Sequence, residues 1–235
     1  MRPAAVRLEP NGYTGEVQDP TPSPGQPSLR AEQVAQTRAA LIAAGRHLFG
    51  RDGFADTSVE DLAREARVTI GALYHHFPTK AALFETVFEA VHAELLTASA
   101  VAAQDASDEI ELLTLGTEAF LDAVLQPDIQ RIIIIDAPAV LGLARFTELD
   151  ERYAFAAISA ALEAAAASGK LRARDPATLA RLLLGAMTRG AMLIAGSPEP
   201  AQTRHAVAMT FRDLLAGMAV TPPGSAGGIP AGQDS

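Results

Sequence analysis

Two short helical patterns separated by a three-residue turn constrain the fold of this chain more than any other feature. The first opens at Thr57-Ser58-Val59-Glu60, where we expect a capping box, with the threonine hydroxyl and the Glu60 side chain each satisfying one free amide. The second runs from about Thr69 to Phe77 and ends before Pro78, which cannot continue a helix. Two helices joined by so tight a turn, Ala66-Arg67-Val68, form a helix-turn-helix.

The rest of the sequence also favours helices. Alanine and leucine dominate a hydrophobic fraction of 49%, aromatic residues make up only 5%, and apolar residues rarely alternate with polar ones. Ile132 to Ile135 would by itself suit a buried strand, but it lies between helical patterns, so we expect a helix here too. The predicted fold class is all-α, with an N-terminal three-helix unit and a longer C-terminal helical domain.

Composition also suggests where the folded part begins and ends. Residues 1–29 are rich in Pro, Gly and Ser, and residues 221–235 have the same character, so both are expected to be disordered. We therefore predict a helix-turn-helix domain over residues 30–78 and a second helical domain over residues 79–220.

Several classes of protein are disfavoured by composition. There is no cysteine, so disulfides and thiolate metal sites are impossible. The formal net charge of -9 argues against a protein that coats nucleic acid non-specifically, which would need many Lys and Arg residues. No signal-peptide pattern and no uninterrupted apolar stretch of roughly 18–20 residues is present, so we expect a cytoplasmic protein that does not cross a membrane.

No metal, cofactor or catalytic site is expected. The adjacent His75 and His76 would point about a hundred degrees apart on a helix, and no carboxylate stands at ligand spacing beside them. The sequence lacks a glycine-rich phosphate loop, a nucleophile elbow and a patterned carboxylate pair. An enzyme that uses a central pocket is therefore a disfavoured alternative, and the prediction is that the protein is not an enzyme.

The segment from Thr37 to Phe88 resembles the DNA-binding domain of the tetracycline-repressor (TetR) family. The similarity is carried by Ala63-Arg64-Glu65-Ala66-Arg67-Val68-Thr69-Ile70-Gly71-Ala72-Leu73-Tyr74-His75-His76-Phe77-Pro78-Thr79-Lys80. The resemblance implies a transcriptional regulator, expected to be a repressor, that binds double-stranded DNA at a palindromic operator and is released by a small molecule. The alternative is a helical partner-binding protein that no longer reads DNA.

The resemblance and the motif together suggest which residues contact DNA. The second helix of the motif would lie in the major groove, where base pairs are distinguishable, with its first residues nearest the bases. Tyr74 and Lys80 resemble the pair with which the family contacts phosphates, and Thr57 and Ser58 open a helix N-terminus, which favours anions. The candidate DNA-binding residues are Thr57, Ser58, Thr69, Ile70, Gly71, Ala72, Tyr74, His75 and Lys80.

One residue of the turn departs from the family pattern. The family usually has glycine at the position of Arg67, where the backbone often needs a positive φ. We expect Arg67 to carry strain on the order of 1 kcal/mol, or the turn to be adjusted around it.

The resemblance also implies a homodimer and a ligand pocket in the C-terminal domain. Two apolar stripes on the last two helices are the predicted dimer interface, although they could instead pack within one subunit: Leu179, Leu183, Ala186, Gly190 and Ile194, then Val207, Phe211, Leu214 and Leu215. The predicted pocket would be mainly apolar with a few polar anchors. Its candidate residues are Phe120, Ile132, Asp136, Phe146, Tyr153, Met187, Arg189 and Met192.

Overall fold

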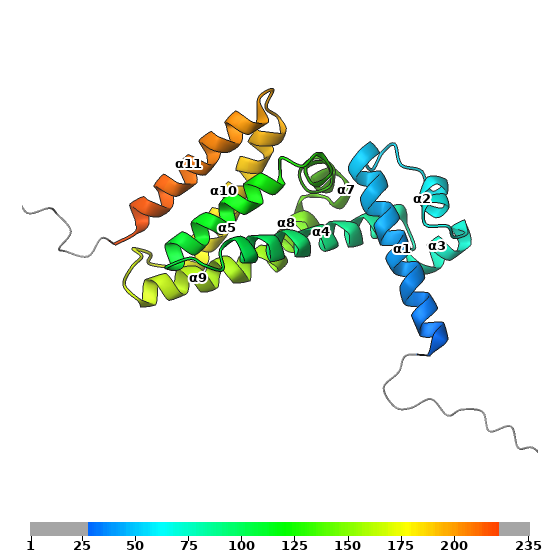
Figure 1. Ribbon diagram of the computed structural model, residues 1–235, viewed down its shortest axis with the longest axis horizontal. Coiled ribbons are helices and arrows are strands. Elements are labelled where there is room, and N and C mark those ends of the chain that lie inside the picture. The colour runs from blue at the N-terminus through cyan, green and yellow to red at the C-terminus, as the bar shows by residue number, and fades with distance from the viewer. Residues whose placement is uncertain (1–27, 221–235) are drawn as a thin grey trace, which may run out of the picture. The chain divides into compact units, whose positions relative to one another are not determined.

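The computed structural model describes residues 28–220, and helices without any strand make up this part of the chain (Figure 1). The all-α prediction is therefore confirmed. The elements are α1 (Leu29–Asp52), α2 (Val59–Glu65), α3 (Ile70–His76), α4 (Lys80–Ala102), α5 (Glu109–Ala123), α6 (Pro127–Ile129), the π-helix η1 (Gln130–Asp136), α7 (Ala137–Leu141), α8 (Leu143–Asp150), the π-helix η2 (Glu151–Phe155), α9 (Ala156–Ala167), α10 (Pro176–Ala195) and α11 (Pro200–Met218).

Residues 28–36 form a unit of their own, which holds the first turns of α1. The Ser28 hydroxyl accepts a hydrogen bond from the backbone N–H of Ala31 at 3.2 Å and so caps the helix. Their side chains are exposed. The predicted arm reached residue 29, where the structure already has helix, and the rest of the arm and the predicted tail 221–235 lie outside the described residues.

The second unit begins at Thr37 and contains the helix-turn-helix. From Leu41 onward, α1 buries one face, and Leu62 of α2 and Leu73 of α3 are fully buried in the same core. The chain leaves α1 at Gly53, whose φ of +86° is a left-handed conformation that favours glycine. These contacts hold α2 and α3 in a fixed arrangement on α1.

The capping box at the start of α2 lies one residue later than predicted. Ser58, not Thr57, is the N-cap, and its hydroxyl accepts a hydrogen bond from the backbone N–H of Asp61 at 3.0 Å. The same hydroxyl donates to the Asp61 carboxylate at 2.6 Å, which holds the pKa of that carboxyl below its ordinary value. Two overlapping segments have the sequence pattern of a capping box: Thr57-Ser58-Val59-Glu60 and Ser58-Val59-Glu60-Asp61. The path of the chain after α1 determines which of the two caps the helix.

Arg67 has a φ of 57° and is the only non-glycine residue of the described part with a left-handed backbone. A side chain in this region crowds the following carbonyl, which costs roughly 1–2 kcal/mol. The turn between α2 and α3 therefore has the positive φ that was expected at this position. The turn has kept the conformation that glycine would adopt.

A single hydrophobic core joins the helix-turn-helix to the next helices. The cluster that contains Leu62 and Leu73 also contains Phe84 and Phe88 of α4 and residues of η1, α7, α8 and α10. The rings of Phe49, Phe54 and Phe84 pack with centroids 5.3–5.8 Å apart. The core therefore includes residues on both sides of Pro78. The domain boundary predicted at this residue stays a prediction.

The isoleucine run forms the π-helix η1 and not a strand. Ile132, Ile133 and Ile134 are all buried, which a regular helix with one apolar face would not achieve for three successive residues. A π-helix is closed by hydrogen bonds between residues five apart, so such residues lie on the same side. In this way η1 places Arg131 and Asp136 together, with Nε and Oδ2 3.8 Å apart.

A second core fills the C-terminal half, where α5, α9, α10 and α11 pack on one another, as Figure 1 shows. The helices α10 and α11 approach closely at Gly190, where an added Cβ would lie 2.8 Å from Val207 Cγ1. Of the helices described, α10 alone has the length and hydropathy of a membrane-crossing segment. One such helix is weak evidence of a span, because helices of soluble bundles share these properties.

Candidate nucleic-acid interface and ligand cavity

The outward side of α3 carries most of the residues that were predicted to contact DNA. Leu73 is fully buried and fixes α3 to the core, and Ala72 is half-buried beside it. The Thr69 hydroxyl accepts the backbone N–H of Ala72 at 3.1 Å, which starts the helix and leaves the hydroxyl proton free to donate. The exposed side chains on and just before this helix are those of Thr69, Ile70, Tyr74 and His75, with the exposed backbone of Gly71 among them.

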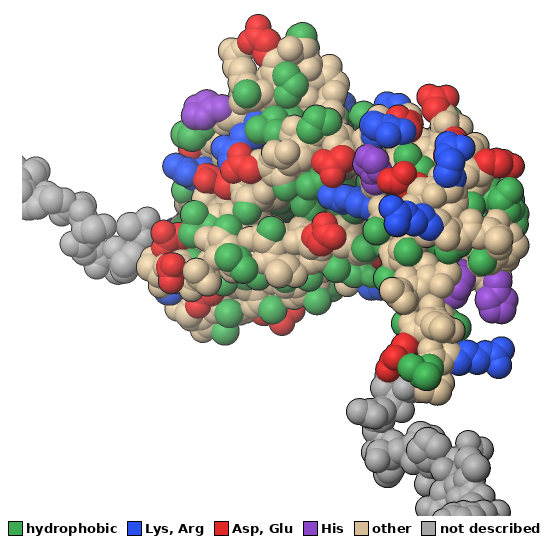
Figure 2. All heavy atoms as spheres, turned by 45° about the vertical axis from the view of Figure 1, so that its right-hand side comes forward, with side chains coloured by type: hydrophobic (Ala, Val, Ile, Leu, Met, Phe, Trp, Pro, Cys, Tyr) green, Lys and Arg blue, Asp and Glu red, His purple; other side chains and the backbone are tan. Residues whose placement is uncertain are grey.

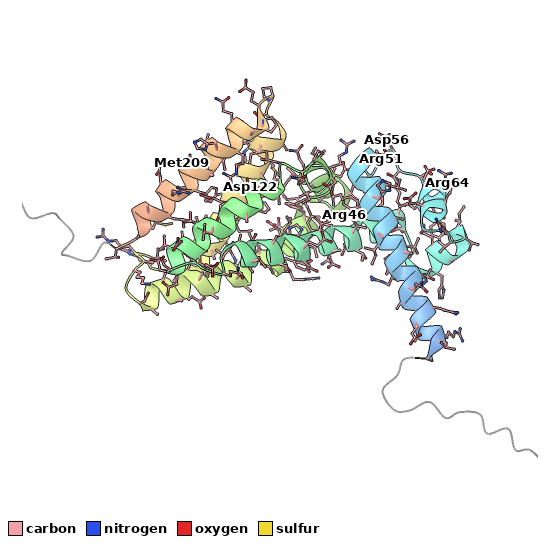
Figure 3. The ribbon with its side chains drawn as sticks, in the orientation of Figure 1. Arg46, Arg51, Asp56, Arg64, Asp122 and Met209 are labelled. Carbon is pink, nitrogen blue, oxygen red and sulfur yellow. The ribbon has the colours of Figure 1, made fainter. Side chains whose placement is uncertain are left out.

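The charge around α3 differs from that of the whole chain. Residues 68–80 contain no Asp or Glu, and residues 37–80 contain six Lys or Arg against five Asp or Glu, whereas the chain has a net charge of -9. Arg51 and Arg64 are among the exposed arginines of this part (Figure 3). Figure 2 shows basic and histidine side chains gathered over the helix-turn-helix, with acidic ones between them. A phosphate backbone would therefore meet no negative side chain on α3 itself.

Thr57 is not available to DNA in this structure, contrary to the prediction. Its side chain is buried, with only 2% exposed, and its hydroxyl donates to the carbonyl of Gly53 at 2.7 Å. This bond closes the loop between α1 and α2. Ser58 is half-buried and its hydroxyl is used by the cap of α2, so both residues shape the helix-turn-helix from within.

The Lys80 side chain also points inward. Its ammonium donates to the carbonyls of Phe54 at 2.7 Å and Thr57 at 2.8 Å, and it lies 4.2 Å from the centre of the Phe54 ring. Two of the three N–H donors of a lysine are thus satisfied inside the chain. The role that the structure shows for Lys80 is to tie the first residue of α4 to the loop before α2. Its third N–H donor is not used by these bonds, so the predicted phosphate contact stays a prediction.

The same loop is held from its other side by η1. The backbone N–H of Phe54 donates to the Asp136 carboxylate at 2.7 Å, and the Arg131 guanidinium donates to the carbonyl of Asp52 at 3.1 Å, at the C-terminus of α1. A cation at this end of a helix compensates its free carbonyls. Residues 52–57 are therefore clamped between α4 and η1.

A cavity of about 570 Å³ lies inside the C-terminal half of the second unit. Its wall is built by α4, α5, the last residue of α8, η2, α9, α10 and α11 and is mostly apolar, with Leu95, Leu113, Ile158, Leu183 and Phe211 among the lining residues. Ligand pockets of proteins have volumes of roughly 300–1,000 Å³ and a similar apolar character. The cavity is thus large enough for a small organic molecule.

Small residues on one side of the helix that runs through η2 and α9 create this space. Ala154, Ala157, Ala161 and Ala164 line the cavity at spacings of three or four residues, so they occupy one face. Gly116 on α5 also lines the cavity. Leucine at these positions would fill the space that the methyl groups leave open.

Four polar side chains meet at one part of the cavity wall. The Asp150 carboxylate lies 3.3 Å from His92 Nε2 and accepts a hydrogen bond from the Thr188 hydroxyl at 3.1 Å. The rings of His92 and Tyr153 are 5.8 Å apart. Burial raises the pKa of the Tyr153 hydroxyl above its ordinary value, and the Glu89 carboxylate adds to this effect. The phenol therefore stays protonated and remains a hydrogen-bond donor.

Three of the eight predicted pocket residues line this cavity, namely Phe120, Tyr153 and Met187. Ile132 and Phe146 are instead buried in the core shared with the helix-turn-helix, and Met192 packs against that core. Asp136 contacts Phe54, as described above, and Arg189 is exposed. His92, Asp150 and Thr188 were missed, although a histidine among Phe88, Val91 and Leu95 was a visible signal.

The structure places most of the predicted dimer residues in the interior of the chain itself. Phe211 and Leu215 pack in the second core with Leu183, Ile194 belongs to the first core, and Gly190 is covered by Val207. Leu179 and Ala186 are partly buried against the same second core, and Leu214 alone of the set is exposed. Most residues of the two stripes therefore pack within one subunit, which was the alternative to their forming a dimer interface. Exposed apolar side chains on these helices are Leu182, Leu193, Met209 and Leu214.

Two family models match the chain. The model for bacterial regulatory proteins of the tetR family matches residues 41–87, and the model for the tetracyclin repressor-like C-terminal domain matches residues 110–218. The first covers most of the helix-turn-helix domain and the start of α4, and the second covers the helices of the cavity wall other than α4.

Individual proteins agree with these matches. The structure of a TetR-family transcriptional regulator from Pectobacterium atrosepticum is 33% identical, covers 81% of this chain and 98% of its own, and superposes with a TM-score of 0.73. The HTH-type transcriptional regulator TtgR of Pseudomonas putida is 39% identical over 61 residues, which are 26% of this chain but only 29% of TtgR. CymR of the same species is 30% identical over 51% of this chain and 62% of its own length. The chain therefore belongs to the tetracycline-repressor family of bacterial regulatory proteins.

Proposed function

We propose that the protein is a sequence-specific DNA-binding transcriptional regulator of the cytoplasm, a homodimer that binds a palindromic operator and is released from it by a small molecule. The observation that carries the DNA-binding part is the outward face of α3, which presents Thr69, Ile70, Tyr74 and His75 from a segment, residues 68–80, that contains no Asp or Glu. A helix of this length fits the major groove with its N-terminal residues against base edges.

A mobility or fluorescence assay with the DNA upstream of its own gene tests this proposal. Tyr74→Phe and His75→Ala should each weaken binding to that DNA, because both side chains are exposed on the reading helix. Thr97→Ala is the control, since Thr97 is exposed on the distal half of α4. If both α3 variants bind like the wild type, or if no upstream fragment is bound, the chain is better explained as a partner-binding protein.

The dimer part of the proposal rests on the surface of α10 and α11. Leu182 is 66% exposed, and Leu193, Met209 and Leu214 are also exposed, so the described residues leave these apolar side chains of the two helices uncovered. Gly185 lies on the same side of α10 as Leu182 and Leu193, and an added Cβ there would meet nothing within 4 Å. We assign this surface to the second subunit, which would place one reading helix at each half-site.

The small-molecule part rests on the cavity. It lies among the helices of the C-terminal half and is lined in part by α4, the helix that follows the helix-turn-helix directly. A ligand that binds more tightly when α4 is in one position shifts the protein towards that position. Such a shift can change the distance between the recognition helices of the two subunits, and its size is limited by the difference in ligand affinity between the two positions. The relatives are regulators and not enzymes, and the proposal assigns no catalytic residue.

A further inference from the structure

The lining of the cavity indicates the charge of its ligand. Among the described residues that line it, Glu109 and Asp150 are the acidic ones, and none is Lys or Arg. The remainder is mostly Ala, Leu and aromatic side chains. An anionic ligand would be taken out of water without meeting a cation, which is unfavourable in an apolar site.

One of the two carboxylates is already compensated. Glu109 Oε2 accepts a hydrogen bond from Lys170 Nζ at 3.0 Å, and this bond holds the pKa of the Glu109 carboxyl below its ordinary value. Glu109 therefore needs no positive group from a ligand.

Asp150 has no such partner. Its side chain is only 17% exposed, and no Lys or Arg nitrogen of the described residues lies within 4.0 Å of its carboxylate. Its contacts are one hydrogen bond from the Thr188 hydroxyl and the approach of His92 Nε2. A carboxylate has about four lone-pair positions, so sites for further donors remain.

The geometry around His92 gives Asp150 one possible N–H donor, on Nε2 at 3.3 Å. Its side chain is 7% exposed, and Nδ1 is buried with no hydrogen-bond partner in the described residues. A proton on Nε2 bonds to Asp150, whereas a second proton on Nδ1 would be a buried donor without an acceptor. Among the described residues, no Lys or Arg pairs with the negative charge of Asp150.

We propose that the cavity binds a lipophilic amine, whose protonated nitrogen donates to Asp150 while its apolar body lies along the alanines of η2 and α9. The ammonium supplies the charge and the N–H donors that Asp150 lacks, and the neighbouring Tyr153 ring offers a further favourable surface for a cation. This inference rests on the proposed function, since it names the chemical class of the effector.

Three probes of one shape and different charge test it on the full-length protein at neutral pH: octylammonium, octan-1-ol and octanoate, each measured by titration calorimetry. Octylammonium should bind about tenfold or more tightly than octanoate, with octan-1-ol between them. Asp150→Asn should remove the advantage of octylammonium over octan-1-ol. Asp122→Asn is the matched control on the exposed side of α5 (Figure 3) and should keep that advantage.

The wild-type comparison decides the proposal even where Asp150→Asn does not fold. Equal affinities, a preference for octanoate or no binding of any probe would overturn it. So would an amine preference that survives in a folded Asp150→Asn protein, or that survives Ala161→Phe, which fills the cavity. Operator DNA is titrated in parallel. Amine binding without an effect on operator affinity would contradict the effector role alone, whereas intact operator binding without an amine preference would contradict the ligand class alone.

Discussion

The carboxylate of Asp136 accepts a hydrogen bond from the backbone N–H of Phe54 at 2.7 Å, across 82 positions of the sequence. Phe54 stands in the loop before α2, and Asp136 is the last residue of η1. Because Lys80 binds the carbonyl of the same Phe54, one peptide segment is in contact with α4 on one side and with η1 on the other. Both α4 and η1 are thus hydrogen-bonded to the loop that connects α1 to α2.

Asp136→Ala should lower the free energy of unfolding by about 2 kcal/mol, since it removes a charge-assisted hydrogen bond and leaves a half-buried N–H unpaired. Urea denaturation followed by circular dichroism measures this change. Asp105→Ala, an exposed aspartate between α4 and α5, should change stability by less than about 0.5 kcal/mol. Equal effects of the two substitutions would show that the contact with Phe54 contributes nothing.

Lys80→Met should destabilise the protein by about 2 kcal/mol and leave the salt dependence of DNA binding unchanged, because its ammonium is bound to two carbonyls and not displayed for a phosphate. The control is Lys170→Met, which breaks an exposed ion pair with Glu109 and should cost less than about 1 kcal/mol. A flatter salt dependence in Lys80→Met would restore the phosphate contact that the sequence suggested.

Arg67→Gly should raise stability by about 1 kcal/mol, since glycine adopts a φ of 57° without steric cost. Arg64→Gly, three residues earlier in α2, should lower stability by about 1 kcal/mol because glycine is a poor helix former. Thermal melting of the two variants should therefore shift in opposite directions. A loss of stability in both would mean that the Arg67 side chain makes a compensating contact.

Gly190→Ala should cost about 1–3 kcal/mol, because the new methyl group would lie 2.8 Å from Val207 Cγ1 and force α10 away from α11. Gly185→Ala on the same helix has free space around it within the chain and gains helix propensity of up to about 1 kcal/mol. Comparing the two variants distinguishes a steric effect inside the subunit from an effect of backbone flexibility. Denaturation at low protein concentration measures the free energy of unfolding of each variant.

Leu182→Glu should convert the protein to monomers that keep their melting temperature at low concentration, since Leu182 is exposed in the chain and lies on the surface assigned to the partner. Leu183→Glu, its buried neighbour, should instead unfold the protein by burying an unpaired charge. Sedimentation velocity distinguishes the two. A folded Leu182→Glu dimer would place the subunit contact elsewhere.

The features that could be predicted from the sequence are those whose cause is local. The threonine and serine caps, Pro78 and the turn at Arg67 determine α2 and α3 within a few residues, and these elements are where they were expected. The cap itself was misplaced by one residue, because the choice between Thr57 and Ser58 depends on the hydrogen bond from Thr57 to Gly53.

The cavity and the outer surface of the bundle could not be derived in the same way. A stripe such as Leu183 to Ile194 shows that a helix face is buried, but it does not show whether the partner is the same subunit or another. The cavity arises from side chains that are too small to fill the space, and Ala157 or Ala161 is equally compatible with close helix packing until the neighbouring helices are placed.

Because η1 is a π-helix, its contact with α1 depends on the number of residues in η1 as well as on their type. In a regular α-helix, residues five apart point in directions roughly 140° apart, so Arg131 and Asp136 would not reach the same site. Deleting any one of the four isoleucines would leave the composition almost unchanged but rotate every later residue relative to α1. Insertions and deletions in this run should consequently be tolerated far less, over evolutionary time, than exchanges among Ile, Val and Leu.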